Sequence, residues 1–448
     1  MERRSLLKDG AMALGGLALA PRAFGAAPSL AEVAREAWLY TVPLVEVAKV
    51  RERILRKRAA NGFVHNRNLT TVASQRVTSP NNDTLYSHGV LDLRAGAVAL
   101  RLPPTGNRYL SVQLVDMYSN NLAVLGTRAT GRDGGHFLVA GPTGAAPATA
   151  IRAPSDWVFV LARTLIDDEA DLAAAHAVQD GLVIEGASGP PPTMAVPARD
   201  ARWADYFGQV GGLIAESPPP PTDDALLARI APIGLSRSGF RPPAFSADEM
   251  AQIETGLKAA RAYAAQPQLG SRVVDGWAYP AWNLGRFEQD YGFRAQIAVS
   301  GLFALPLDEA LYTRSVGDAP DGLFHGDAYH VHFAAEAMPP VDAFWSMTLY
   351  EATPEGQFFF TPNAIDRFAI GSRTPDLLRN PDGSLDIWIS RAASSPQRRN
   401  NWLPAPLDKP FILSMRAFLP RASLLNGSYH FPPVLNADCG IGAQSAPR

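Results

Sequence analysis

The sequence predicts a mainly β protein with a helical insert, in which an N-terminal β-sandwich precedes a C-terminal jelly-roll-like β-domain. Short runs of alternating apolar and polar residues recur in both halves of the chain, a pattern typical of half-buried strands. The chain contains 37 Gly and 38 Pro, which supply the turns that many short strands need. Longer stretches with helical spacing separate the two β-rich parts, and they predict the insert.

Length and composition limit the class of protein. With 448 residues, the chain is too long for one ordinary core. We expect an N-terminal helix (28–60), a β-sandwich (61–166), a helical insert with linkers (167–268) and a jelly-roll-like domain (269–448). The net charge of −2 gives no reason to expect nucleic acid or an anionic membrane as a partner. The single cysteine, Cys439, excludes an intrachain disulfide and a thiolate metal cluster.

Residues 1–27 have the features of a twin-arginine export signal. Arg3 and Arg4 precede a short apolar run at 10–20, and small residues at 25–27 offer a cleavage site. The apolar run is shorter than the roughly 20 residues that a membrane-spanning helix needs. The sequence therefore predicts a periplasmic or secreted protein whose mature chain does not span the membrane.

Local signals mark where helices begin and where they end. Ser29 with Glu32, and Ser246 with Glu249, form the pattern of a capping box at a helix start. Pro43 should kink or split the first helix, because proline removes a hydrogen-bond donor and crowds the preceding turn. Proline runs at 190–192 and 218–221 are typical of extended linkers. We expect the helical insert to form an interface or to cover a cleft between the β-domains.

Alternation predicts individual strands at 97–102, 110–115, 157–163 and 385–389. In the second of these, Leu110, Val112 and Leu114 fall on one face. Ser111 and Gln113 fall on the other, because successive residues of a strand point to opposite sides. Short strands at this spacing favour a sandwich over a parallel α/β sheet.

Residues 79–87 form the most polar motif of the N-terminal half, with the sequence Ser-Pro-Asn-Asn-Asp-Thr-Leu-Tyr-Ser. Asn81, Asn82 and Asp83 favour a turn, because their side chains can hydrogen-bond to nearby backbone. The structural interpretation is an Asx turn that leads into a strand. The functional interpretation is a polar cluster at the mouth of a β-domain, where Asp83 acts as base, ligand or anchor.

This motif, followed by Leu91-Asp92-Leu93, resembles the N-terminal signature of a bacterial two-part family. The halves of that family are domain of unknown function 1254 and domain of unknown function 1214. The alternating residues Asn61, Phe63, His65, Arg67 and Leu69 resemble the segment that precedes the signature. The resemblance covers roughly residues 29–433. It implies two β-domains joined by a helical segment, and it implies no particular reaction.

The first candidate site gathers polar residues of the N-terminal β-domain with two from the C-terminal half. A carboxylate beside a histidine can perform acid–base catalysis, and arginine can stabilise developing negative charge. We predict that the loops carrying Asp83, Tyr118 and Arg163 meet at one edge of the sandwich, where Arg163 keeps Asp83 ionised. The predicted catalytic residues are Asp83, His65 and Arg163, and the predicted substrate-binding residues are Arg67, Asn81, Tyr86, Tyr118, Trp345 and Arg367.

Two alternatives remain open. His330 and His332, with Glu336 four residues on, resemble the first metal motif of cupins, which are also jelly rolls. Both side chains would point the same way on a strand, as a divalent metal requires, although a stacked or buried histidine pair fits the same pattern. The other alternative is a ligand- or carbohydrate-binding surface without catalysis, formed by Trp345, Tyr350, Trp388, Trp402, Asn363 and Asn401.

The sequence thus favours an exported enzyme that performs hydrolytic or related acid–base chemistry in a cleft between two β-domains. Its substrate would be a small molecule or an oligomer of polar character. A non-catalytic binding protein and a cupin-like metal enzyme are the alternatives. The sequence requires no cofactor, although its residues would accommodate a divalent metal. The composition also allows a homo-oligomer.

Overall fold

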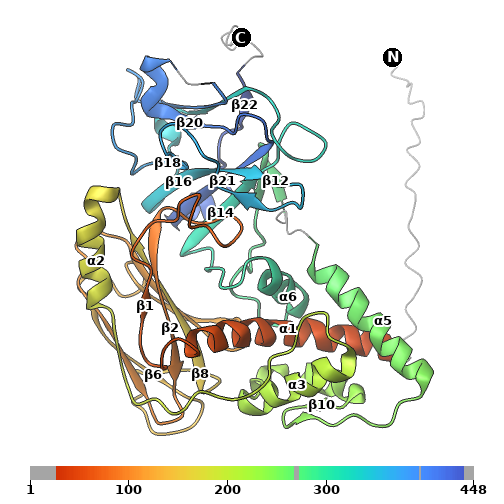
Figure 1. Cartoon of the computed structure of the whole chain (residues 1–448). Coiled ribbons are helices and arrows are strands. Elements are labelled where there is room, and N and C mark those ends of the chain that lie inside the picture. The colour runs from red at the N-terminus through yellow and green to blue at the C-terminus, as the bar shows by residue number, and fades with distance from the viewer. Residues whose placement is uncertain (1–26, 267–271, 393–394, 438–448) are drawn as a thin grey trace, which may run out of the picture.

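The computed structural model describes residues 27–266, 272–392 and 395–437. An N-terminal β-sandwich lies beside a group of helices, and a C-terminal β-domain lies above both in Figure 1. The prediction of a mainly β fold with helices is therefore confirmed. The predicted export signal at 1–27 falls, except for its last residue, outside the described residues. None of the helices in the described ranges is long and apolar enough to span a membrane.

The N-terminal sandwich consists of two sheets. The first has the order β1-β2-β8-β4-β5, and the second has the order β7-β6-β3-β9. The strands of the first are Val64–His65, Thr84–Asp92, Trp157–Leu165, Leu110–Val115 and Asn121–Gly126. Those of the second are Ile151–Arg152, Gly135–Ala140, Val98–Leu102 and Val183–Glu185. Apolar residues such as Leu91, Val112 and Leu100 fill the space between the sheets, as alternation predicts.

The outer face of the first sheet is covered as well. Strand β4 is buried at every position, so Ser111 and Gln113 are as inaccessible as Val112 on the opposite face. Helices cover one end of this outer face, and the C-terminal domain covers the other (Figure 1). Buried polar side chains on a covered face must find partners inside the protein, which is why this face matters for the site.

Helix α1 (Leu30–Leu55) is the centre of the helical part and begins with the predicted capping box at Ser29. It packs against α3 (Trp203–Glu216), α4 (Asp224–Ile230), α5 (Ala247–Ala264) and α6 (Tyr291–Ser300). The prediction that Pro43 splits this helix is wrong, because α1 continues through it without a break. The residues around Pro43 are buried on every side, so tertiary packing outweighs the local cost of the proline.

The helical insert extends this core. Helices α3, α4 and α5 pack against α1, and Figure 1 shows α3 on the side of α1 away from the C-terminal domain. Helix α5 starts with the second predicted capping box. Helix α2 (Leu172–Gly181) lies against the sandwich instead. A small hairpin of β10 (Leu235–Ser236) and β11 (Gly239–Phe240) completes the insert.

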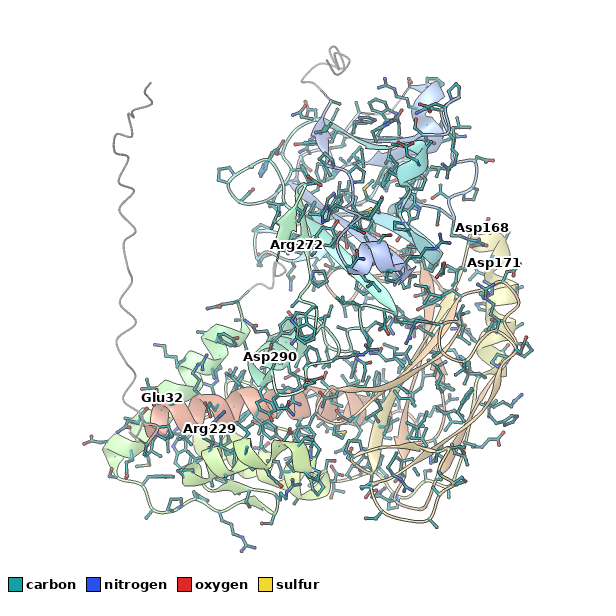
Figure 2. All side chains as sticks on the ribbon, turned by 180° about the vertical axis from the view of Figure 1, so that it is seen from behind. Glu32, Asp168, Asp171, Arg229, Arg272 and Asp290 are labelled. Atoms are coloured by element: carbon teal, nitrogen blue, oxygen red, sulfur yellow. The ribbon has the colours of Figure 1, made fainter. Side chains whose placement is uncertain are left out.

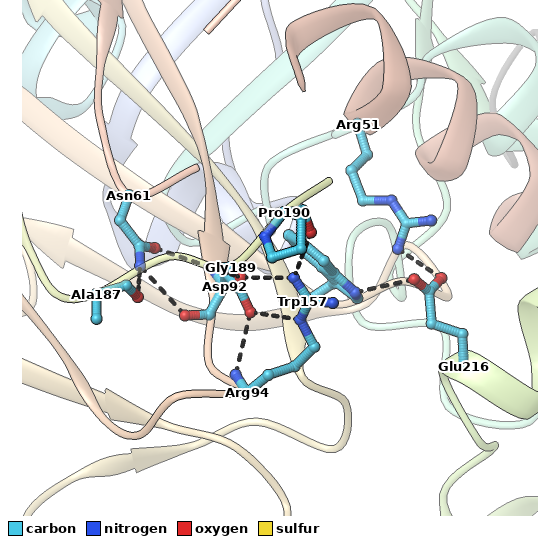
Figure 3. A network of polar contacts seen from close by, with 9 residues as sticks. All are labelled: Arg51, Asn61, Asp92, Arg94, Trp157, Ala187, Gly189, Pro190 and Glu216. Carbon is cyan, nitrogen blue, oxygen red and sulfur yellow. Dashed lines mark hydrogen bonds and ion pairs between the residues drawn. The ribbon is translucent and has the colours of Figure 1, made fainter. Parts of the chain in front are cut away.

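A polar network fixes the linker that precedes the first proline run (Figure 3). The buried carboxylate of Asp92 pairs with Arg94 at 2.8 Å and accepts the backbone N–H of Gly189 at 2.9 Å. The Arg94 guanidinium also lies 4.6 Å from the centre of the Trp157 ring. The indole N–H of Trp157 donates to Glu216 of α3 at 3.1 Å. The network therefore connects the sandwich, the linker and the helical core.

The C-terminal domain is a second two-sheet structure with an apolar core. One sheet has the order β12-β13-β14-β21-β16-β17, with β18 paired to β16, and the other has the order β20-β19-β15-β22. The strands of the first are Arg272–Val274, Trp277–Tyr279, Ala310–Ser315, Phe411–Pro420, Val341–Ala352, Phe358–Phe359 and Ala369–Gly371. Those of the second are Trp402–Pro404, Leu385–Ser390, Ala328–Phe333 and Leu435–Asn436. A short helix, α7 (Ala422–Leu425), follows β21.

The two β-domains contact each other through an apolar cluster and through the polar motif. The ring of Tyr109 from the sandwich lies 5.8 Å from that of Phe344 in the C-terminal domain. The backbone N–H of Ser79 donates to the carbonyl oxygen of Phe358 at 2.7 Å. The carbonyl oxygen of Pro80 accepts the hydroxyl of Tyr350 at 2.6 Å. The motif loop is therefore a docking element between the domains.

Candidate active site at the junction of the β-domains

Asn81 forms the predicted turn. Its side-chain oxygen accepts the backbone N–H of Asp83 at 2.6 Å and that of Thr84 at 3.2 Å, which is an Asx turn. Ser79 adopts a left-handed conformation with φ of 52°, although the following proline favours an extended one. The turn places Asp83 immediately before β2, where its side chain meets the C-terminal domain.

The Asp83 carboxylate makes its main contact with the other domain. Its Oδ2 accepts the hydroxyl of Ser346, on β16, at 2.8 Å. Burial raises the pKa of Asp83, while the charge of Arg416 on β21 and the hydrogen bond from Ser346 act in the opposite direction. A carboxyl whose pKa is raised holds a proton to a higher pH than an exposed carboxyl does, which is a property of groups that transfer protons.

Asp83 and Ser346 form part of the wall of a cavity of about 350 Å³. The sandwich contributes Asp167 and Asp168, and the C-terminal domain contributes Trp345, Arg367 and Arg373 to the lining. Figure 2 shows Asp168 at the end of α2 that lies beside the C-terminal domain. The volume suits a small molecule, and sites of this kind favour domain interfaces.

Both cavity arginines are held by the protein. The Nε of Arg373 donates to Asp167 at 2.7 Å, which makes an ion pair between the two domains. One Arg367 nitrogen donates to three backbone carbonyl oxygens, including that of Trp402 at 3.0 Å. Fixed guanidinium groups lose little conformational freedom on binding a polar substrate.

Strand pairing sets a line of polar side chains across the sandwich, which we call the N-terminal polar row. Tyr86 of β2 pairs with Arg163 of β8, and Arg163 pairs with Ser111 of β4. Residues that pair across antiparallel strands point to the same face. The Arg163 guanidinium lies 5.6 Å from the centre of the Tyr86 ring.

A matching line crosses the C-terminal domain, and we call it the C-terminal polar row. Tyr312 of β14 pairs with Arg416 of β21, which pairs with Ser346 of β16. Burial raises the pKa of Tyr312, and the charges of Arg163 and Arg416 oppose that rise. Tyr312 therefore lies within electrostatic reach of Arg163 in the N-terminal polar row as well as of Arg416 in its own row.

The predicted role of Arg163 as the cation beside Asp83 needs correction. Arg163 donates to the side-chain oxygen of Gln113 at 2.8 Å and to the carbonyl oxygen of Phe303 at 3.3 Å. The cation that acts on Asp83 is Arg416. Arg163 sits one strand in from β2, so its side chain reaches Tyr86 and Gln113, whereas Arg416 comes from the opposing domain.

The predicted convergence of Tyr118 with Asp83 is not found. Tyr118 is 1% exposed, donates to the carbonyl oxygen of Ser217 at 2.9 Å and packs against Tyr40 in the helical core. Strand β4 begins opposite Thr164 and ends opposite Phe159. Its last residue is therefore about 17 Å further along the sheet from the Asp83 end, at roughly 3.4 Å per residue.

His65 and Arg67 are also separate from the Asp83 cavity. The Nδ1 of His65 is hydrogen-bonded to Ser87 at 2.8 Å, and Arg67 pairs with Asp180. Both residues line a second cavity at the edge of the sandwich, to which Asp83 does not contribute. The expected pairing of a histidine with the Asp83 carboxylate is therefore corrected, because β1 lies alongside the middle of β2 and not its start.

The histidine pair of the C-terminal domain has a different third partner from the predicted one. His330 Nε2 and His332 Nδ1 are both bonded to Asp386 Oδ1, at 2.8 and 2.7 Å. Ligand atoms of these three residues lie within 4.8 Å of one another, a set that fits a divalent transition metal. Glu336 does not belong to this group, because it lies in the short helix after β15, whereas Asp386 pairs with His332 across the sheet.

The aromatic residues proposed as stacking platforms are mostly core. Trp345, Tyr350 and Trp402 are almost fully buried. Trp388 is half-buried, with the His330 ring 4.4 Å from its centre and the Arg398 guanidinium 3.6 Å from it. The side chains of Asn363 and Asn401 form hydrogen bonds with backbone groups of the same domain. In the described residues, Trp345 is the one member of this set that reaches the junction cavity.

Sequence reasoning missed Ser346, Arg416, Asp167, Asp168 and Arg373 as parts of the site. Ser346 and Arg416 are polar residues with apolar neighbours in their strands, and both are buried. That pattern signals a polar interior contact, although it does not identify the partner. The three remaining residues lie in loops or at element ends, where the sequence carries no comparable signal.

Fold and cavity together define a two-part protein, with a β-sandwich built on a helical core and a C-terminal β-domain that closes one side of the site. The chain matches the family model "Protein of unknown function (DUF1254)" over residues 60–186. It matches "Protein of unknown function (DUF1214)" over residues 309–422. The protein therefore belongs to the family that combines these two domains in this order, as the polar motif predicts.

A solved structure shares the fold of this chain. The VPA0106 protein from Vibrio parahaemolyticus is 22% identical and superposes with a TM-score of 0.69 over 91% of this chain and 100% of its own. An uncharacterised protein from Burkholderia cenocepacia is 13% identical, with a TM-score of 0.44 over 86% of this chain and 85% of its own. The chain has no significant match among curated proteins. The likeness to the Vibrio protein concerns the fold.

Proposed function

We propose that this protein is an exported enzyme that performs hydrolytic or related acid–base chemistry on a small polar substrate at the junction of its β-domains. The observation that carries the proposal is the Asp83 carboxyl, which lies at the wall of a cavity. Burial raises the pKa of this carboxyl, so it binds a proton more readily than an exposed carboxyl does. A carboxyl in such surroundings is suited to proton transfer near neutral pH.

The surrounding residues support distinct roles. Ser346 donates to one Asp83 oxygen and leaves the other free to act on water or on a substrate hydroxyl. The Arg416 charge limits how far the pKa of Asp83 rises, so that the group remains able to ionise. Arg367 and Arg373 at the cavity wall would bind a carbonyl or anionic group of the substrate and stabilise developing negative charge.

Turnover by Asp83 variants tests the proposal. We would assay the purified protein against nitrophenyl esters, nitrophenyl glycosides and lactones, with Asp83→Asn and Ser346→Ala. Asp342→Asn is a matched control, because Asp342 is an exposed carboxylate on the same strand as Ser346. We expect Asp83→Asn to reduce kcat/KM by about 10²-fold or more, Ser346→Ala to reduce it less, and Asp342→Asn to leave it unchanged. Saturable binding without turnover by the wild type would instead favour a non-catalytic binding protein.

Export rests on the first residues of the sequence. Replacement of Arg3 and Arg4 by lysine should keep the protein in the cytoplasm, because the paired arginines are the element that the export system recognises. Terminal sequencing of periplasmic material that finds Met1 would contradict an export signal at 1–27.

A metal enzyme is the second candidate, and the cluster of His330, His332 and Asp386 favours it. Elemental analysis of protein purified without chelators tests it. A stoichiometric transition metal that is lost in His330→Ala would support the second candidate. Metal-free wild-type protein with full turnover would exclude it.

A further inference from the structure

A second cavity, of about 530 Å³, opens where the end of α1 meets the edge of the N-terminal sandwich. It lies between the last turn of α1, the edge strand β1 and the middle of β2. The proposed enzyme site does not include it, and Asp83 is not part of its wall. The titratable residues that line it are Arg53, Lys57, Arg58, His65, Arg67 and His88.

The charge of this cavity is one-sided. Four permanently charged cations face it, and no acidic residue is among the described residues that line it. Arg67 is paired with Asp180, at the rim, and Arg58 donates to the carbonyl oxygen of Phe63. Within the described ranges, Arg53 and Lys57 have no carboxylate partner. The positive charges therefore outnumber the nearby negative charge, which is the condition for attracting an anion.

The C-terminal end of α1 opposes the binding of an anion only weakly. The C-terminus of α1 carries a partial negative charge of about half an elementary charge, and α1 ends at Leu55, next to the cavity. Arg53 lies in the last turn of the helix and Lys57 follows it, so two full positive charges outweigh the partial one. The net electrostatic potential inside the cavity therefore remains positive.

Both histidines respond to nearby positive charge. Burial lowers the pKa of His65, and the nearby charge of Arg67 lowers it further, with a smaller opposing effect from Asp180. Burial also lowers the pKa of His88, and the charges of Arg53 and Lys57 add to this effect. Arg67 therefore lies near the His65 ring, and Arg53 and Lys57 lie near the His88 ring.

We propose that this cavity binds a small dianion, whose phosphoryl or carboxylate oxygens contact the Arg53 and Lys57 side chains and the His88 imidazole. His65 belongs to the opposite face of the sheet, because His88 pairs with Val64 and His65 pairs with Ser87. Guanidinium groups offer forked donors that match the oxygens of phosphate and carboxylate groups. A concave site of this size suits a free small molecule, whereas a membrane surface would favour a convex or flat patch. The proposal is independent of the Asp83 chemistry, since no residue belongs to both cavities.

Calorimetric titration of the full mature chain with inorganic phosphate, and separately with citrate, tests the proposal at low ionic strength. We expect saturable one-to-one binding of at least one of them by the wild type, and a weakening of about 10-fold or more in the double variant Arg53→Gln, Lys57→Gln. Arg132→Gln is the control, because Arg132 is an exposed arginine of the same sandwich without an ion pair in the described residues. No saturable binding to the wild type, or equal weakening in the control, would overturn the proposal.

Two further measurements locate the ligand and identify its source. A bound dianion should raise the pKa of His88, because its negative charge opposes the effect of Arg53 and Lys57 on that ring. Proton NMR of the imidazole rings can follow the shift. Binding without a shift in the pKa of His88 places the anion elsewhere and contradicts the proposal. Vesicles of phosphatidylcholine with and without phosphatidylglycerol provide the other measurement. If the protein binds vesicles and neither phosphate nor citrate competes, the ligand of this cavity is a lipid headgroup and not a free small molecule.

Discussion

At the scale of single residues, burial of the Asp83 carboxyl costs folding free energy and also suits the group to proton transfer. Its backbone is fixed by an Asx turn and its side chain by Ser346 of the other domain. Burial raises the pKa of the carboxyl, so the ionised form is less stable in the folded protein than in the unfolded chain. Groups with this balance are common at functional sites, where a stable fold tolerates a local penalty.

The pH dependence of stability follows from the direction of this shift. A carboxyl with a raised pKa contributes its full stability below the unfolded value of about 3.9 and loses it as the pH rises through the folded value. We therefore expect Asp83→Asn to be more stable than the wild type at pH 7, by about 1 kcal/mol, and to lose this advantage near pH 3.5. Thermal unfolding across pH measures the difference.

The control for this experiment is Asp342→Asn, which removes an exposed carboxylate paired with Arg421. Exposed pairs contribute little to stability, so this variant should follow the wild type at every pH. An Asp83→Asn variant that is less stable at pH 7 would show that the bond from Ser346 outweighs the cost of burying the charge.

At the scale of elements, the contact between α1 and α5 depends on one glycine. A Cβ atom placed on Gly256 of α5 would lie less than 3.0 Å from the carbonyl oxygen of Ala31, which belongs to the backbone and cannot move alone. The helices therefore approach as closely as they do because position 256 lacks a side chain. Gly208 of α3 has open space around it and provides a comparison within the same helical core.

We expect Gly256→Ala to destabilise the protein by about 1–3 kcal/mol through overpacking, although alanine is intrinsically the better helix former by about 1 kcal/mol. Gly208→Ala should stabilise it by up to about 1 kcal/mol, because it gains helix propensity without a clash. Chemical denaturation of both variants gives the two free energies. Equal effects would mean that α5 can shift away from α1 at little cost.

At the scale of the whole molecule, the polar motif connects parts of the chain that are far apart in sequence. The Pro80 carbonyl oxygen accepts the Tyr350 hydroxyl at 2.6 Å, and Arg416 donates to that hydroxyl. The same loop carries Asp83 to Ser346. Docking of the two β-domains and assembly of the cavity are therefore one event, which predicts that they are lost together.

Tyr350→Phe tests this coupling, because it removes the buried hydroxyl and leaves the Pro80 carbonyl without its 2.6 Å donor. We expect a loss of about 1–3 kcal/mol and a calorimetric transition that broadens or splits as the two domains unfold less cooperatively. Tyr429→Phe is the matched control, since its hydroxyl donates to Ala337 within the C-terminal domain. A single sharp transition in both variants would show that the loop does not couple the domains.

Local signals in the sequence determined the parts of the structure whose partners are near in the chain. Ser29 and Ser246 cap their helices through carboxylates three residues on. Asn81 forms its turn with the next backbone groups. Leu385 and Ile387 are buried and alternate with the partly exposed Asp386 and Trp388, as predicted. In each case the interacting groups lie within a few residues, so propensity and spacing suffice.

Only the tertiary structure decided what the polar side chains contact. Ser346 and Arg416 reach Asp83 from the other domain, Asp386 replaces Glu336 beside the histidine pair, and Tyr118 lies at the far end of the sheet. Each outcome depends on strand register or domain docking, which join residues that are far apart in the sequence. The continuity of α1 through Pro43 has the same origin, because packing by the surrounding helices outweighs a local preference.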